Sequence, residues 1–134
     1  MQLIIIIVIQ QNVTILNLKE NFFDPNWHFH PHYQLFTVIK GTGTRFIGDD
    51  IRHFEEGDTV FLGPNMPHLW RSDRNYFEKE SQLQTEGIVV YFKEDFLGND
   101  FFEKPEMFDI KSFLKNSERG STKIFTRTRC STCF

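Results

Sequence analysis

The sequence predicts an all-β fold, a jelly-roll barrel (double-stranded β-helix) followed by a short C-terminal helical appendix. The first observation is a series of short apolar runs separated by Gly, Pro, Asn and Asp, which is typical of strands joined by tight turns. The second is a change after Phe92, where the strand pattern stops and helical periodicity follows. Strands first and helices afterwards favour a β-barrel with a helical addition.

The chain of 134 residues is long enough for one domain with a real core. Its predicted organisation has four parts: an N-terminal strand or arm at 1–11, the barrel at 12–92, the helical appendix at 93–120 and a disordered tail at 121–134. The first part is apolar and β-branched, so it is either an edge strand of this chain or a strand that pairs with a partner subunit.

The predicted elements follow the apolar runs. The expected strands are residues 12–18, 27–32, 34–40, 44–47, 51–54, 59–62, 68–71 and 83–92, and the expected helix is 105–119. Pro31 interrupts the second of these runs, which indicates an edge or a bulge there. The helix begins near a proline and ends at Gly120, and its apolar stripe should pack on the barrel or on a second subunit.

Histidines mark the candidate site. His28, His30 and His32 fall within five residues, and Gln34 follows them. In a strand, residues two apart face the same side, so His28, His30 and Gln34 share one face if the strand is continuous. A later strand could bring His68 to that face, whereas His32 beside the proline is expected at the surface.

Aromatic residues accompany the imidazoles. Phe36 has the strand parity of Gln34, and Trp70 has that of His68. A ring that stacks on a sugar-like or aromatic ligand and ordinary core packing are both consistent with this placement. The candidate ligand-binding residues are therefore His28, His30, Gln34, Phe36, His68 and Trp70.

A divalent metal is the alternative occupant of such a site. Three imidazoles with Gln34 as a fourth group form a possible ligand set. An amide brings no negative charge to offset a divalent cation, so we expect no resident metal and no cofactor. If a metal were bound, its ligands would be His28, His30, Gln34 and His68.

The same residues carry a family resemblance. The spacing His-x-His-x3-Gln-x6-Gly, from His28 to Gly41, resembles the first cupin motif, with Gln where the family usually has Glu. The stretch from Gly57 to His68 resembles the second. Longer strings at 41–49, 54–58 and 63–73 resemble the N-terminal sensing domain, arabinose-binding and dimerisation-like, of AraC-type transcription regulators. That likeness runs over about 12–125.

The resemblance implies a function. It implies a barrel that senses a small-molecule effector, a sugar being one candidate, and a homodimer formed through the helical appendix. The stripe expected at the dimer interface is Met107, Ile110, Phe113 and Leu114. Family members carry two helix-turn-helix units after this domain, whereas this chain stops where the linker should begin, so the chain alone should not bind DNA specifically. The alternatives are a stand-alone metal-dependent cupin enzyme (dioxygenase or isomerase) and a dimerisation module with a vestigial pocket.

Catalytic residues are not predicted. The sequence offers no Ser-His-Asp or Cys-His arrangement and no phosphate-cradling Gly loop. Glu55, Glu56 and Asp58 form an acidic cluster, but they lie in a turn, where solvated carboxylates are expected. The chain is therefore not expected to be an enzyme.

Charge and composition limit the remaining classes. The net charge of −3 does not indicate the positively charged surface that is typical of nucleic-acid-binding proteins. The two cysteines, Cys130 and Cys133, lie in the predicted tail, so a disulfide scaffold is not expected. The apolar run at 3–9 is too short to span a membrane and lacks the flanks of a signal peptide, so a cytoplasmic location is expected.

Overall fold

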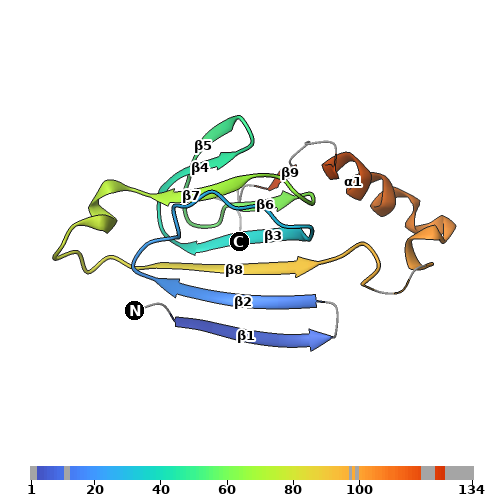
Figure 1. The fold of residues 1–134 in the computed structure, drawn as a ribbon, viewed down its shortest axis with the longest axis horizontal. Coiled ribbons are helices and arrows are strands. Elements are labelled where there is room, and N and C mark those ends of the chain that lie inside the picture. Colours follow the sequence, from blue (N-terminus) through green and yellow to red (C-terminus); the bar gives the residue numbers. More distant parts are fainter. Residues whose placement is uncertain (1–2, 11–12, 97, 99, 119–122, 126–134) are drawn as a thin grey trace, which may run out of the picture.

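The structure is a computed structural model that describes residues 3–10, 13–96, 98, 100–118 and 123–125. Figure 1 shows how its strands, short 3-10 helices (η) and α-helix are arranged. In chain order they are β1 (Leu3–Gln10), β2 (Val13–Glu20), β3 (Tyr33–Lys40), β4 (Gly43–Ile47), β5 (Asp50–Phe54), β6 (Thr59–Leu62), β7 (His68–Ser72), η1 (Arg74–Phe77), β8 (Thr85–Phe92), η2 (Phe101–Glu103), η3 (Pro105–Met107), α1 (Phe108–Glu118) and β9 (Lys123–Phe125). This element series confirms the predicted all-β class with a short C-terminal helix.

Two antiparallel sheets form the barrel. One has the order β1-β2-β8-β3-β6-β9, and the other has the order β5-β4-β7. Figure 1 shows the larger sheet as the lower layer, the smaller one across its top, and α1 beyond the end of β8. Non-consecutive neighbours such as β3 and β8 arise because the chain crosses between the sheets, as a jelly roll requires.

The barrel core takes side chains from both sheets. In β4, buried and half-buried residues alternate along the strand, so one face meets the interior. Phe36 on β3 lies opposite Val89 on β8, and both are buried. The core consists of Phe23, Phe36, Val38, Ile47, Phe54, Val60, Leu62, Trp70 and Val89.

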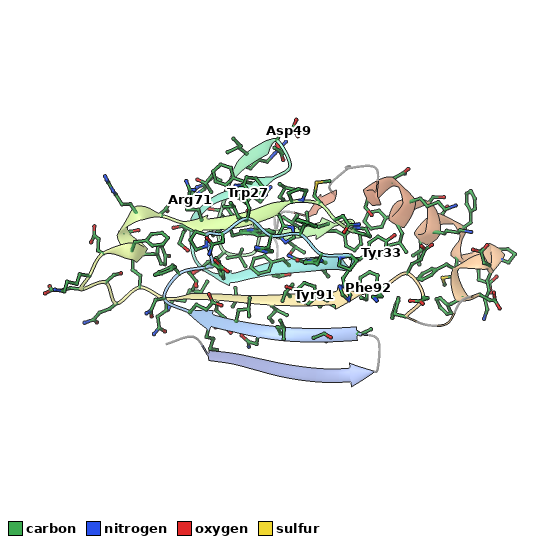
Figure 2. The ribbon with its side chains drawn as sticks, in the orientation of Figure 1. Trp27, Tyr33, Asp49, Arg71, Tyr91 and Phe92 are labelled. Atoms are coloured by element: carbon green, nitrogen blue, oxygen red, sulfur yellow. The ribbon has the colours of Figure 1, made fainter. Side chains whose placement is uncertain are left out.

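A second apolar cluster joins the helical appendix to the outside of the barrel. Tyr33 on β3 and Phe61 on β6 lie on the faces of these strands that point away from the barrel interior. Both are buried together with Phe102 and Leu114. Figure 2 shows Tyr33 and Phe92 at the end of the sheet nearest the helix, where their rings stack with centroids 5.3 Å apart. None of the helices among the described residues is long and apolar enough to cross a membrane.

The predicted helical stripe divides between two environments. Met107, Phe113 and Leu114 pack against this second cluster, so the barrel itself covers them. Ile110 is 46% exposed and the adjacent Phe108 is 68% exposed. The predicted helix at 105–119 begins as η3 and continues as α1.

The prediction of a strand at 27–32 is wrong. This segment has no ladder, only an isolated antiparallel bridge between His28 and His68. Pro31 cannot donate a ladder hydrogen bond. The segment is held instead by separate hydrogen bonds to three places on the barrel, described below.

Both ends of the described chain add strands to the larger sheet. β1 pairs with β2 as a hairpin within the chain, so it is an edge strand of this sheet. Where the sequence predicted a tail at 121–134, residues Lys123–Phe125 form β9 beside β6, because a Lys-Ile-Phe run can complete the open edge of that strand. Cys130, Cys133 and the rest of 126–134 lie outside the described residues.

The expectation of a solvated Asp58 is also wrong. Its carboxylate is buried and accepts a hydrogen bond from Arg45 at 3.0 Å. It also accepts the backbone N–H of Glu55 at 3.3 Å, which closes the turn before β6. Glu55 and Glu56 are exposed, as expected for a turn. The pair is structural, because it ties β4 to that turn.

Candidate functional site

The interior of the barrel contains a cavity of about 370 Å³. Strand register decides which side chains reach it. Gln34 on β3 lies opposite Tyr91 on β8, and Phe36 lies opposite Val89. On the other side of β8, Leu16 of β2 also lies opposite Val89. The lining residues are Leu16, Leu18, Glu20, Phe23, Asp24, Asn26, Trp27, His28, Gln34, Phe36, Trp70, Val89 and Tyr91.

The segment 21–32 lies across the cavity and supplies five of these residues. Phe23 N–H donates to Ser72 Oγ at 3.1 Å. His28 and His68 exchange two backbone hydrogen bonds, of 3.2 and 3.0 Å, and Asn65 N–H donates to the carbonyl of His30 at 2.7 Å. Asn65 can reach this carbonyl from a tight turn in which its φ is 63°. The segment is thus anchored at three points.

Three imidazoles meet at one end of the cavity. The ring centroids of His28 and His68 are 4.3 Å apart, and those of His30 and His68 are 5.2 Å apart. His30 Nε2 lies 2.8 Å from Gln34 Oε1, and its ring is 5.0 Å from that of Tyr91. The spacing of the motifs therefore does bring His28, His30, Gln34 and His68 together, although the first two do not stand on a strand.

Backbone carbonyls set the tautomer of each ring. Nδ1 of His28 lies 2.9 Å from Asn26 O, Nδ1 of His30 lies 3.1 Å from His32 O, and Nδ1 of His68 lies 2.6 Å from Met66 O. A carbonyl only accepts, so each Nδ1 carries the proton and donates. In a neutral ring Nε2 is then the acceptor. Nε2 of His68 is buried and has no hydrogen-bond partner among the described residues.

This tautomer has a consequence for Gln34. A neutral His30 can only accept at Nε2, so it requires the amide NH₂ of Gln34 to face it rather than the carbonyl oxygen. Amide oxygen and nitrogen are interchangeable by a rotation of the group, and the hydrogen-bond network decides between them. Gln34 is buried, so this hydrogen bond fixes its side chain at the wall of the cavity.

Burial controls the protonation of the cluster. It lowers the pKa of His68 from 6.5 to about 4, a shift that the hydrogen bond to Met66 opposes and that repulsion from His28 and His30 reinforces. The pKa of His32 is lowered by burial and by Lys93. Burial raises the pKa of Tyr91. At neutral pH His68 is therefore uncharged.

Aromatic rings form the apolar wall. The ring centroids of Phe36 and Trp70 are 4.6 Å apart, and those of Phe23 and Phe36 are 5.5 Å apart. Gly87 on β8 makes room for them, because a Cβ there would lie 2.7 Å from Cζ of Phe36. Trp70 is only 4% exposed, and its indole N–H has no hydrogen-bond partner among the described residues. The cavity wall thus contains a buried donor that the protein leaves unpaired.

The predicted site residues occupy two positions. His28, Gln34, Phe36 and Trp70 line the cavity, while His30 and His68 contact them from the adjoining cluster. Their role as ligand-binding residues stays a prediction. His32, expected at the surface, is half-buried, with its ring centroid 6.0 Å from that of His30.

Several lining residues were not predicted as part of the site. Val89 and Tyr91 share a strand parity that could have been noticed, but only the pairing of β8 with β3 shows that this parity faces Gln34. The same holds for Leu16 and Leu18 on β2. Phe23 lies in an irregular segment, which carries no parity signal at all.

The donor set does not fit a divalent metal. Among the described residues, no three His, Cys, Asp or Glu side chains are grouped so that they could hold a metal ion. The cluster itself offers imidazoles and one amide, without a carboxylate to balance a divalent charge.

A larger groove of about 750 Å³ lies elsewhere on the barrel. It is lined by Thr37, Val38, Ile39, Gly41, Thr42, Glu55, Glu56, Gly57, Thr59 and Tyr76. The hydroxyls of Thr37 and Thr59 bond to each other at 3.1 Å, and both glutamates are exposed. Since no predicted site residue reaches it, the smaller cavity is the better candidate.

The fold and cavity define a class: a small β-barrel that encloses a mixed aromatic and polar pocket. Residues 15–75 match the family model described as a cupin domain. None of the curated proteins matches the sequence.

Solved structures share the fold at low sequence identity. A protein from Ralstonia eutropha JMP134, provisionally described as a mannose-6-phosphate isomerase, is 15% identical over 69% of this chain and 85% of its own, with a TM-score of 0.57. A cupin superfamily protein from Desulfitobacterium hafniense DCB-2 is 8% identical over 70% and 79%, with a TM-score of 0.56. An RmlC-like cupin with a double-stranded β-helix fold, from Methanocaldococcus jannaschii, is 21% identical over 69% and 81%, with a TM-score of 0.51. At these identities the likeness establishes the cupin fold alone.

Proposed function

We propose that the barrel binds a small organic effector and that the chain is the sensing and dimerisation domain of an AraC-type transcription regulator. The observation that carries the proposal is the 370 Å³ cavity, whose wall combines aromatic rings in tilted and edge-to-face contact with the fixed amide of Gln34. Pockets of this size and composition are typical of small-molecule sites. The regulator role rests on the sequence resemblance, and we propose the cytoplasm as its location.

Binding is favoured over catalysis by the chemistry of the cluster. His68 is uncharged at neutral pH, and the Nδ1 atoms of all three imidazoles already donate to carbonyls. The cluster contains no carboxylate that could act with them as an acid–base pair. The alternative of a metal-dependent enzyme is tested by elemental analysis of protein purified without chelator, where one tightly bound Zn, Fe or Mn per chain would favour it.

A route for signalling runs through β3. Gln34 and Phe36 face the cavity, while Tyr33 and Leu35 on the same strand pack in the cluster that holds Leu114 of α1. A ligand that shifts β3 therefore acts on both faces, because a packed strand moves as a unit. This arrangement supports a coupling between the effector site and the helical appendix.

We expect the described residues not to read a DNA sequence. The overall charge is −3, and α1 uses Leu114 and Phe113 to pack on the barrel. Sequence-specific readout needs a helix or ribbon whose side chains reach base edges. We expect no specific binding by the chain alone in an anisotropy titration against DNA from upstream of its own gene. Sub-micromolar binding that survives competitor DNA would contradict this part of the proposal.

The proposal is tested by ligand titrations followed by two-dimensional NMR. The probes are monosaccharides, aromatic alcohols, aromatic carboxylates and aromatic amines. We expect at least one of these chemical classes to give saturable shifts centred on β3, β8 and the segment 21–32. Gln34→Leu should weaken that binding, while Thr37→Val, on the same strand but facing the outer groove, should not. Failure of every class to saturate at millimolar concentration would favour a dimerisation module with an unused pocket.

A further inference from the structure

We propose that the groove of about 750 Å³ on the barrel holds the basic C-terminal segment of the same chain, residues 126–134. The proposal concerns a different place from the effector cavity, because the two sets of lining residues have no member in common. Three observations carry it: the acidic side chains of the groove, the direction of β9, and the charge of the segment that follows β9.

The groove carries negative charge that has no counter-charge among the described residues. Glu55 and Glu56 line it and are exposed, and none of its lining residues is Lys or Arg. The three ion pairs among the described residues include neither glutamate. In the same turn, the carboxylate of Asp58 is already paired with Arg45. An exposed acidic turn is not a site by itself, so its occupant has to follow from what the fold brings to it.

The other polar side chains of the groove already have partners. The hydroxyls of Thr37 and Thr59 bond to each other at 3.1 Å, and the hydroxyl of Thr42 donates to Asp73 at 2.7 Å. Tyr76, from η1, adds a half-buried aromatic ring to the lining. The groove therefore offers an occupant negative charge and a ring. Arginine suits both, because its planar guanidinium pairs with carboxylates and stacks on aromatic rings.

The strand β9 directs the chain toward this groove. It pairs antiparallel with β6, and Phe125 lies opposite Thr59, which is the first residue of β6 and one of the lining residues. A chain that continues in the direction of β9 therefore passes the turn at 55–58, which comes just before β6. This turn contains both glutamates of the groove.

The segment that follows β9 has the complementary charge. Residues 126–134 contain Arg127 and Arg129 and neither Asp nor Glu. Continuing the register of β9 and β6 would place Arg127 opposite Gly57 and Arg129 opposite Glu55. Four residues of extended chain cover roughly 13 Å, so the positive charges can reach the acidic turn directly from the end of β9. Because the segment is tethered beside the groove, its effective concentration there is high compared with that of a free basic partner.

The test uses the full chain, which supplies its own labelling site. Its two cysteines, Cys130 and Cys133, both lie in the segment. A nitroxide attached to Cys133 in a Cys130→Ser chain broadens the NMR signals of amides that lie near it. We expect strong broadening at Thr42 and Tyr76, which line the groove, and none at Lys115 on α1.

Charge variants separate docking from mere proximity. Glu55→Gln combined with Glu56→Gln should lower the ratio of docked to undocked segment by roughly fivefold and reduce the broadening accordingly. A higher salt concentration should act in the same direction. Glu78→Gln combined with Glu80→Gln is the matched control, because both side chains are exposed just after η1 but do not line the groove. Unchanged chemical shifts at Tyr91, in the effector cavity, show that each variant keeps the fold.

Exchange of the charges tests the pairing itself. Glu55→Arg combined with Glu56→Arg should abolish the broadening in the groove, and adding Arg127→Glu and Arg129→Glu should restore it. If the exchange does not restore the broadening, or if the two glutamine substitutions leave it unchanged, the groove does not hold this segment.

A mixed sample distinguishes the segment of the same chain from that of a second copy. Isotope-enriched chains without the nitroxide are mixed with unenriched chains that carry it. We expect no broadening of the groove signals in this mixture. Broadening there would mean that the segment of a second copy occupies the groove, which overturns the proposal. None of these outcomes bears on the effector cavity, which the ligand titrations test separately.

Discussion

His68 shows how burial of a single residue sets the chemistry of its neighbours. It is 1% exposed, it donates from Nδ1 to Met66 O, and its ring contacts those of His28 and His30. Its pKa of about 4 makes it an uncharged acceptor over the physiological range. A buried neutral imidazole of this kind lets the cluster act in hydrogen bonding without adding charge to the cavity.

The first prediction concerns the pH dependence of stability. The unfolded chain takes up a proton at His68 near pH 6.5, whereas the folded chain resists protonation until about pH 4. The free energy of unfolding should therefore fall as pH drops through this window, with a contribution from His68 of up to about 3 kcal/mol. Urea unfolding at several pH values should show a smaller loss in His68→Gln. His53→Gln, on the β5 hairpin, should keep the wild-type loss, and equal pH curves for all three proteins would contradict the prediction.

The second prediction concerns the buried ion pair of Arg45 and Asp58. Asp58→Ala leaves the guanidinium of Arg45 buried without its counter-charge, which should cost about 3–5 kcal/mol of unfolding free energy. The pair Arg52–Asp50 on the exposed hairpin is a chemical control in the same sheet, with side chains 61% and 44% exposed. Asp50→Ala should cost less than about 1 kcal/mol. Denaturant unfolding compares the two, and equal losses would show that the buried pair has no special role.

At the scale of elements, β3 and β8 organise the molecule. They pair with each other along most of their length, and their inner faces build the cavity. The outer face of β3 contributes to the cluster under α1. One strand pair therefore connects the two cores, and the packing on its inner face depends on the absence of a side chain at Gly87.

The third prediction tests that packing. Gly87→Ala would place a methyl group 2.7 Å from Cζ of Phe36 and 3.3 Å from Cε1 of Phe23. We expect it to destabilise the fold by about 1–3 kcal/mol, as overpacking does, despite the entropic gain of replacing glycine. Adding Phe36→Leu should recover part of that loss in a double-mutant cycle measured by denaturant unfolding. Additive effects in the cycle would mean that the two residues are not in close contact.

At the scale of the whole molecule, α1 packs on the outside of the barrel with one face and exposes apolar side chains on another. Phe108 and Ile110 are exposed, while Leu114 is buried against the barrel. An exposed apolar strip on an otherwise packed helix is a common feature of subunit contacts. We therefore propose this strip as the contact of the homodimer that the family resemblance implies.

The fourth prediction is a homodimer in light scattering at tens of micromolar chain. Ile110→Lys should shift it toward the monomer with little loss of unfolding free energy, because the side chain is half exposed. Leu114→Ala should instead destabilise the fold by about 2–5 kcal/mol, since it empties a buried position. Ile51→Lys, 61% exposed on β5, is the control and should remain dimeric. A monomeric wild-type chain, or a dimer unaffected by Ile110→Lys, would contradict this interface.

The sequence by itself determined the class of the fold and the neighbourhood of the site. Apolar runs between turn residues are local signals, so the strands at β4, β5, β6 and β8 could be placed within about two residues. The motif spacing also predicted that the histidines meet Gln34, but by way of a strand at 27–32, whereas an irregular segment brings His28 and His30 there. Placing a strand needs only the pattern of apolar and turn residues along a short stretch of the chain, and this pattern is a local property of the sequence.

Only the tertiary structure decided which groups meet across strands. The register of β8 against β3 puts Tyr91 beside Gln34, and the crossing of 21–32 brings Phe23 into the core. Asp58, in the turn before β6, is buried with Arg45, which lies thirteen residues away on β4. These outcomes depend on long-range strand pairing and on the removal of water from buried groups. The alternation of residues along one strand does not reveal which strand pairs with it or which side chains become buried.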